Sequence, residues 1–294
     1  MSNRMAARPY VLGSQGEVLT ARLKSNDIVS GLRRLGIGAG MKLIVHSSMK
    51  SFGRLVDGGP ETVIRALMEA LTDRGTLMMP SFNHYVPFEP QGPGYYDPRN
   101  TPTTNGIIPD TFWRMAHVYR SLNPSHAFAA WGKDAEAYVR YHHRTLTFGV
   151  NSPLEKLYAD GGHCLFIGVR GGANSFQHVV ETLSGADCLG KRTEQYSLKL
   201  PDGRRVLGRT WSWRRESCPC QDQWVDELSG QEQRTPVAAS TLRLYSLQQG
   251  FPIIAKYMRC QGCCVRPREN EWTIPTDWDD AASRLQSDSL AHTY

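Results

Sequence analysis

The residues best suited to chemistry are a histidine and a glutamate three positions apart, His178 and Glu181. Residues at this spacing share one face of a helix, so the carboxylate can contact the imidazole. A carboxylate beside a histidine favours the imidazolium, fixes the ring tautomer and makes the imidazole a better base. The pair could therefore remove a proton from an amine or hydroxyl while that group attacks a carbonyl. The alternative is an ordinary surface pair that stabilises a helix only slightly.

The segments around this pair predict a strand, a turn and a helix. The apolar run 164–169 indicates a buried strand, and the glycine-rich residues 170–173 indicate a turn. Asn174 is a favourable N-cap for the helix that follows. A helix over 174–183 is predicted from apolar residues at helical spacing, namely Phe176, Val179, Val180 and Leu183.

A strand–helix–strand unit precedes this region. We predict a first helix over 28–35, a strand over 42–46, a helix over 61–73 and a strand over 76–79. The polar loop 46–53 follows the first strand, and ligands bind at the carboxyl ends of strands in open α/β sheets. Glycines 36, 38 and 40 precede that strand, whereas a dinucleotide fingerprint follows one, so a Rossmann site is not expected.

The remaining elements are predicted from capping, turn and periodicity signals. The long irregular segment 80–106 is expected to form a lid or binding loop. Helices are expected over 108–115, 134–143 and 152–158. Beyond residue 190 we expect a hairpin of strands 196–200 and 205–209, a helix over 237–249 and a final strand over 251–257.

Together these elements predict an α/β protein, a layered sheet with helices on both faces and parallel early strands. We expect an N-terminal arm over residues 1–24 and an α/β core over 25–190. A cysteine-rich C-terminal portion, 191–294, would pack on the core and add a hairpin and a helix that could hold zinc.

The composition indicates a cytoplasmic protein. The 294 residues are 40% hydrophobic, and no run approaches the roughly 18 apolar residues of a membrane span. Residues 1–8 are polar and show no secretory signal. Seven cysteines, an odd number, favour reduced thiols. The net charge of +6 comes without a long basic run, so neither nucleic acid nor a membrane is expected as a partner; an oligomer is possible.

Two late cysteine clusters suggest a structural zinc site. Pairs of thiolates at C-x-C and C-x-x-C spacing suit tetrahedral zinc. The first-choice ligands are Cys218, Cys220, Cys260 and Cys263. Cys264 or His163 could substitute for one of them, and the alternative is a set of reduced thiols without metal.

An ordered series of short motifs resembles the aminoglycoside N3-acetyltransferase family, the acetyl-CoA-dependent enzymes of the antibiotic-NAT fold. The resemblance covers about residues 25–190. The motifs are His46-Ser-Ser48 with Gly53, Asp57-Gly-Gly59, 75–80, Asp97-Pro98, 106–109, Arg120-Ser121 with Pro124, Ser152-Pro153, and Asn174 with His178-Val-Val-Glu181.

The resemblance implies transfer of an acetyl group from acetyl-CoA to a primary amine, in this family the 3-amino group of the 2-deoxystreptamine ring. It implies that His178 is the general base and Glu181 its orienting partner. It also implies that acetyl-CoA contacts the loops holding Ser47, Ser48, Gly53, Arg120, Ser121 and His126. No cysteine stands at a plausible nucleophile position, which favours direct transfer in a ternary complex.

The chain departs from the family pattern in one loop. Asn123-Pro124 stands where the family often has His-Pro, and Ser125-His126-Ala127 stands where a serine commonly follows. A cationic acceptor needs carboxylates, and the candidates are Glu89, Asp97, Asp110 and Asp187, each of which could equally be a solvated surface charge. The acceptor could instead be another amine, such as an amino sugar or a biosynthetic intermediate. A non-catalytic, zinc-stabilised binding protein is the third alternative.

Overall fold

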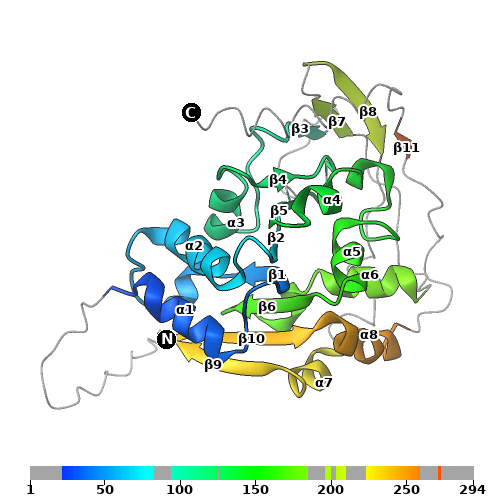
Figure 1. The fold of residues 1–294 in the computed structure, drawn as a ribbon. Helices are drawn as coiled ribbons and strands as arrows, with labels where there is room; N and C mark the ends of the chain where they lie inside the picture. Colours follow the sequence, from blue (N-terminus) through cyan, green and yellow to red (C-terminus); the bar gives the residue numbers. More distant parts are fainter. Residues whose placement is uncertain are drawn as a thin grey trace, which may run out of the picture.

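The computed structural model describes residues 22–82, 94–124, 126–184, 196–199, 203–209, 223–258 and 271–272. A seven-stranded sheet in the order β4-β5-β2-β1-β6-β10-β9 forms its centre (Figure 1). Its strands, in chain order, are β1 (Lys42–Ser47), β2 (Thr76–Pro80), β4 (Tyr119–Arg120), β5 (Phe128–Gly132), β6 (His163–Ile167), β9 (Gln233–Val237) and β10 (Ser240–Ser246).

The middle of the sheet is parallel, as predicted for the early strands. Strand β1 pairs in parallel with β2 on one side and with β6 on the other. Parallel neighbours need a crossover, and the helix α2 (Gly59–Leu71) provides it between β1 and β2. Strands β5 and β10 then pair antiparallel with β2 and β6.

Helices cover both faces of the sheet, which confirms the predicted layered α/β architecture. Because side chains alternate along a strand, Leu43 and Val45 belong to one core cluster and Ile44 to the other. The first cluster packs under α1 (Ser25–Arg34), α2 and α3 (Ile107–Phe112). The second packs under α4 (Ala135–Val139), α5 (Pro153–Ala159), α6 (Phe176–Leu183), α7 (Val225–Ser229) and α8 (Leu247–Lys256).

The predicted helix over 237–249 and strand over 251–257 are wrong. The chain forms the hairpin β9–β10 first and the helix α8 afterwards. Leu242 and Leu244 are buried and alternate with residues that are exposed or partly exposed, which is the period of a strand. Pro236, which precedes the predicted helix and resembles a helix start, lies in the edge strand β9, where a missing N–H is tolerated.

A second sheet, in the order β11-β8-β7-β3, lies beside the first. Its strands are β3 (Gly94–Tyr96), β7 (Tyr196–Lys199), β8 (Arg205–Arg209) and β11 (Glu271–Trp272). The antiparallel pairing of β7 with β8 confirms the predicted hairpin. Strands β9 and β10, although beyond the predicted core limit of residue 190, belong to the same sheet as β1.

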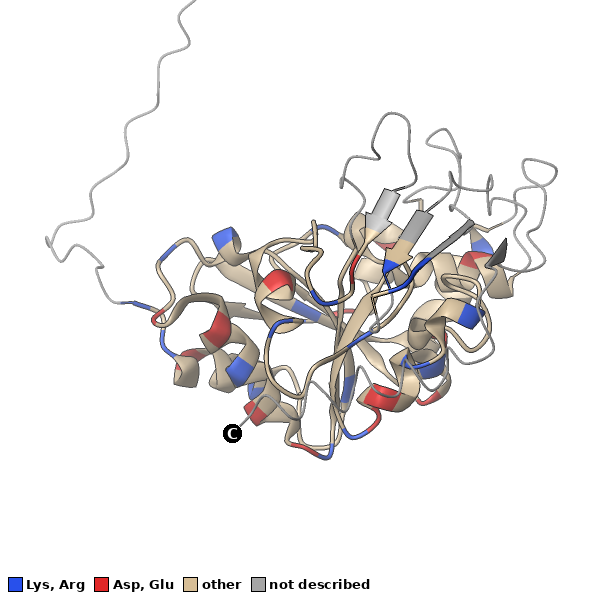
Figure 2. Ribbon diagram, turned by 90° about the horizontal axis from the view of Figure 1, so that it is seen from above, with Lys and Arg blue, Asp and Glu red and all other residues tan. Residues whose placement is uncertain are grey.

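Three short 3-10 helices complete the described elements: η1 (Met49–Phe52), η2 (His142–Arg144) and η3 (Gly171–Ala173). Charged residues of both signs are interspersed over the outer helices and loops (Figure 2). No helix in the described part of the chain is both long enough and apolar enough to cross a membrane.

Candidate active site

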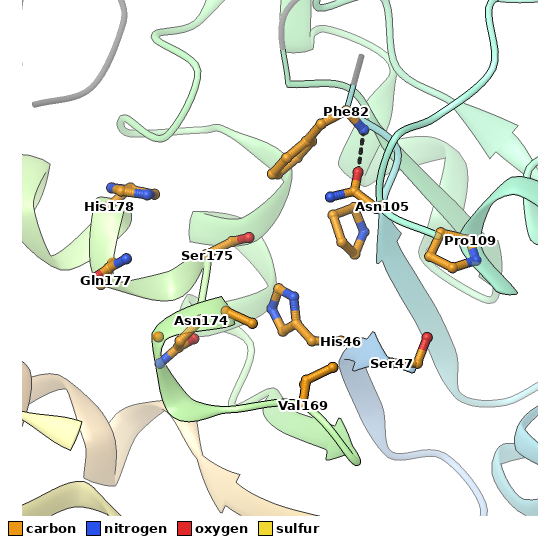
Figure 3. A pocket seen from close by; sticks show the side chains of 13 residues that line it. His46, Ser47, Phe82, Asn105, Pro109, Val169, Asn174, Ser175, Gln177 and His178 are labelled. Atoms are coloured by element: carbon orange, nitrogen blue, oxygen red, sulfur yellow. Dashed lines mark hydrogen bonds between the residues drawn. The ribbon is translucent and has the colours of Figure 1, made fainter. Parts of the chain in front are cut away.

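A cleft of about 260 Å³ opens where the parallel strands end. Strand β1 contributes His46 and Ser47, and the segment after β2 contributes Phe82. The loop after β6 and the start of α6 form the opposite wall (Figure 3). The chain leaves β1 for β2 on one side and later returns as β6 on the other, so the cleft lies where ligands bind in open α/β sheets. The remaining lining residues are Pro80, Asn105, Pro109, Val169, Gly172, Ala173, Asn174, Ser175, Gln177 and His178.

His178 and Glu181 meet on α6 as their spacing predicted. The distance from His178 Nδ1 to Glu181 Oε2 is 2.7 Å, the glutamate side chain is 0% exposed and the histidine side chain 10%. An ionised carboxylate only accepts hydrogen bonds, so Nδ1 carries the proton of the neutral ring. The lone pair of that tautomer is on Nε2. His178 lines the cleft, and this geometry suits a base that is oriented from behind by a buried carboxylate.

Two contacts fix the start of α6. Asn174 Oδ1 accepts a hydrogen bond from the Phe176 amide at 3.2 Å, as expected of a capping side chain, although Ser175 occupies the N-cap position itself. Asn174 Nδ2 donates to the Tyr245 hydroxyl at 2.6 Å, which ties the helix start to β10. The ring of Phe148 packs at 5.0 Å from the His178 ring and restricts its position.

Among the predicted cofactor contacts, Ser47 lines the cleft. Ser48 follows it, and its amide donates to the Ile167 carbonyl at 2.9 Å, joining the loop to β6. Gly53 ends η1 with a positive φ of 65°, and a Cβ there would lie 2.7 Å from the Ala239 side chain. Ser48 and Gly53 are not among the residues that form the cleft wall.

Arg120 is engaged within the protein. Its guanidinium donates to the carbonyls of Pro98, Thr101 and Ser81 at 3.2, 2.6 and 3.3 Å. It lies between two aromatic rings, 4.1 Å from the Trp113 centroid and 5.2 Å from that of Tyr96. The guanidinium therefore ties these chain segments together, and Arg120 is not among the residues that line the cleft.

Ser121 and His126 are also buried away from the cleft lining. Ser121 Oγ lies 2.9 Å from His142 Nδ1 and accepts a hydrogen bond from the Phe128 amide. The His126 ring packs edge-on against Phe82, with the centroids 4.7 Å apart. His126 thus supports a residue that lines the cleft.

The predicted acceptor carboxylates Asp97 and Asp110 are held by their own surroundings. Asp97 accepts from the Arg99 amide and from Asn100, and it pairs with Lys199 at 3.2 Å. Burial opposes ionisation of Asp97, but these bonds outweigh it and lower its pKa. Asp110 accepts from the Thr103 amide, Trp113 Nε1 and Arg114. Asp187 and Glu89 lie outside the described residues.

The four first-choice zinc ligands, Cys218, Cys220, Cys260 and Cys263, lie outside the described residues, as does Cys264. His163, a possible substitute, begins β6, and burial lowers its pKa. Within the described ranges, no group of three or more His, Cys, Asp or Glu side chains could hold a metal ion.

His46 is a cleft residue to which no role was assigned from the sequence. It is 5% exposed, and burial lowers its pKa to about 3. The available signal was its position, since it is the first polar residue after the apolar run Leu43–Val45 and lies near the carboxyl end of β1. Its ring shares the face of Ile44 and packs 5.7 Å from the Phe166 ring.

The fold and the cleft define an α/β protein with its candidate site at the carboxyl ends of parallel strands. The family model described as aminoglycoside 3-N-acetyltransferase matches residues 44–259, and the chain belongs to this family.

Curated relatives and solved structures agree with the family. The chain is 33% identical over 225 residues to aminoglycoside N(3)-acetyltransferase IV of Salmonella sp, covering 74% of this chain and 80% of the relative. It is 34% identical over 173 residues to an SPbeta prophage-derived aminoglycoside N(3')-acetyltransferase-like protein of Bacillus subtilis, covering 53% of this chain and 63% of the relative. A mutant of aminoglycoside acetyltransferase AAC(3)-IVa in complex with a gentamicin superposes with a TM-score of 0.68 at 28% identity, covering 82% of this chain and 90% of the other.

Proposed function

We propose that the protein transfers the acetyl group of acetyl-CoA to the 3-amino group of the 2-deoxystreptamine ring of an aminoglycoside. The observation that carries the proposal is the His178–Glu181 pair, joined at 2.7 Å and placed on the wall of the cleft. The names of the relatives supply the substrate class.

In this reaction His178 acts as the general base. A protonated amine has no lone pair for attack, so the neutral amine reacts, and Nε2 takes the proton that its nitrogen loses on bonding to the thioester carbon. The carbonyl π electrons move to oxygen, the carbon–sulfur bond then breaks, and CoA leaves as the thiolate and takes up the proton from the His178 imidazolium, which restores the base. Glu181 stabilises the imidazolium that forms in between.

We propose direct transfer without an acyl-enzyme. Among the described residues, Cys164 is the one cysteine. It is fully buried in β6, where burial raises the pKa of its thiol. A thiol in that state is a poor nucleophile. Acetyl-CoA would therefore meet the acceptor directly in a ternary complex.

The acyl end of acetyl-CoA is proposed to lie beside Ser47, which lines the same cleft as His178. Ser48, Gly53, Arg120, Ser121 and His126 remain predicted cofactor residues from the family resemblance. Their contacts within the protein support an indirect contribution to cofactor binding, in which these residues hold the loops that shape the cleft.

The acceptor is tested by thiol release. We expect CoA to be released from acetyl-CoA with aminoglycosides that carry a free 3-amino group, because this nitrogen must reach the base. The matched control is the same drug already acetylated at that nitrogen, for which release should fall to background.

Other outcomes separate the alternatives. Equal release from simple amines or amino sugars would assign a different acceptor to the same chemistry. Binding of acetyl-CoA without release on any amine would contradict transfer and favour the binding-protein alternative.

A structural zinc is proposed from the spacing of Cys218, Cys220, Cys260 and Cys263. Elemental analysis of protein purified without added metal should find about one zinc per chain. The cytoplasmic location expected from the sequence would keep these thiols reduced and able to bind.

The paired variants Cys260→Ser and Cys263→Ser should lose the metal and lower the melting temperature. The control is Cys164→Ala, a buried cysteine in the sheet that should leave the zinc content unchanged. Zinc-free protein together with unaltered stability of the two serine variants would contradict the site.

A further inference from the structure

His46 lies on the cleft wall on the same face of the sheet as α6. It is the next-to-last residue of β1, the central parallel strand, and its neighbour Ile44 on that face belongs to the core cluster packed under α6. His46 and His178 both line the cleft, one from the sheet and one from the helix (Figure 3). A substrate in the cleft therefore meets one imidazole from each layer.

One ring nitrogen of His46 has no hydrogen-bond partner within the described protein. Its Nε2 is buried and has no hydrogen-bond partner among the described residues. A buried polar atom without a partner has given up its hydrogen bonds to water without replacing them, and this is unfavourable. A substrate atom that forms a hydrogen bond with this ring would satisfy the nitrogen. The cleft therefore suits a substrate with a polar atom at this position.

The ring of His46 is suited to donating a hydrogen bond as a neutral imidazole. Burial lowers its pKa to about 3, so it is neutral over the range in which an amine can be deprotonated. A neutral imidazole still carries one N–H, and such a donor can polarise a carbonyl oxygen without taking part in proton removal. The described wall of the cleft holds no Lys, Arg, Asp or Glu.

We propose that His46 donates a hydrogen bond to the acyl carbonyl oxygen of acetyl-CoA and to the oxyanion that forms from it. The assignment rests on the proposed function. When the amine attacks, the nitrogen–carbon bond forms and the carbonyl π electrons pass to the oxygen beside the His46 N–H. When the oxygen re-forms its double bond, the carbon–sulfur bond breaks. His178 receives the amine proton. His46 therefore stabilises the negative charge on the oxygen, and His178 removes the proton from the nitrogen.

The test compares two unreactive ligands that differ in the carbonyl. In acetyl-carbadethia-CoA a methylene replaces the thioester sulfur and leaves a ketone, whereas S-ethyl-CoA has a similar length and no carbonyl. We expect wild-type protein to bind the ketone about 5- to 10-fold more tightly, the value of one hydrogen bond. His46→Phe keeps a ring against Phe166 but has no N–H, and it should abolish this preference. His46→Gln supplies an amide donor and should restore part of it.

Turnover gives a second readout. Removing one donor to an oxyanion lowers kcat by about 10²–10³, and His46→Phe should show a loss of this size. The KM for acetyl-CoA should rise by at most about 10-fold, the value of the bond to the ground-state carbonyl. Should the phenylalanine variant not fold, as judged by thermal melting, His46→Ala replaces it with the same expected loss of preference. If neither folds, the carbonyl stretch of the ketone bound to wild-type protein should lie below its value in water, and an unshifted stretch overturns the assignment.

A preference for the ketone that survives in His46→Phe would overturn the proposal, as would equal binding of both ligands to the wild type. If the wild type turns over aminoglycosides but shows no carbonyl preference, His46 alone is misassigned. If it neither binds these CoA analogues nor releases CoA, the proposed function fails and this assignment fails with it.

Discussion

Replacing His178 by alanine is expected to lower kcat by roughly 10²–10⁴, the usual contribution of a general base. The variant loses the nitrogen that accepts the amine proton, while Glu181 stays buried behind it. Acetyl-CoA binding should persist, because His178 is not assigned to the cofactor. The measurement is steady-state turnover with an aminoglycoside, alongside acetyl-CoA binding and thermal melting.

Glu181→Gln should reduce kcat less than His178→Ala. The amide keeps the shape of the side chain but lacks the charge that stabilises the imidazolium. His117→Asn is the matched histidine control, since His117 is exposed and is not among the cleft-lining residues. Near-normal turnover of a folded His178→Ala protein that still binds acetyl-CoA would place the base elsewhere, and His126 would be tested next.

Arg120→Met is expected to lower the free energy of unfolding by about 2–4 kcal/mol. Methionine keeps much of the apolar contact with Trp113 and Tyr96 but leaves the carbonyls of Pro98, Thr101 and Ser81 without their donor. The melting temperature should fall by several degrees, which calorimetry or circular dichroism would measure.

The control for this variant is Arg114→Met. The Arg114 guanidinium also lies over the Trp113 ring, at 4.0 Å, but its side chain is 46% exposed and its partner Asp110 is close to the surface. Exposed pairs contribute about 0–1 kcal/mol, so this variant should melt close to the wild type. A normal melting temperature for Arg120→Met together with a raised acetyl-CoA KM would instead support the cofactor role that the family resemblance implies.

The sequence predicted the elements whose signals are local. The parallel β1 and β2 with their crossover helix follow from short apolar runs and glycine stops, and α5 follows from Ser152, whose Oγ accepts from the Glu155 amide at 3.4 Å. The order of β10 and α8 was wrong because Pro236 resembles a helix start and the apolar run 251–257 fits either a strand or a buried helix. Contacts across the sheet decided between them, and a single sequence does not contain those contacts.

At the candidate site, too, local contacts could be predicted from the sequence and long-range contacts could not. His178 and Glu181 could be paired in advance because a helix fixes residues three apart. The positions of Arg120 and Asp97 could not be, because Arg120 is held by Ser81 and Tyr96, and Asp97 by Lys199 from a strand about a hundred residues later. Contacts of this kind depend on topology, and topology is fixed only when the sheet is assembled.

Strand β6 lies between β1 and β10, and this order has a consequence for the protein during translation. The ribosome makes β1 and β6 well before β10, so a nascent chain can pair one side of β6 while the other side still lacks its neighbour. Strand β6 is apolar from Cys164 to Ile167. Until β10 is made, the unpaired backbone of β6 is a template for association with other chains. The unpaired edge of β6 is covered when the hairpin β9–β10 forms, after residue 246 has left the ribosomal exit tunnel. Productive folding of the sheet therefore waits for β10, and a ribosome that pauses between β6 and β10 prolongs the period in which the chain is prone to aggregate.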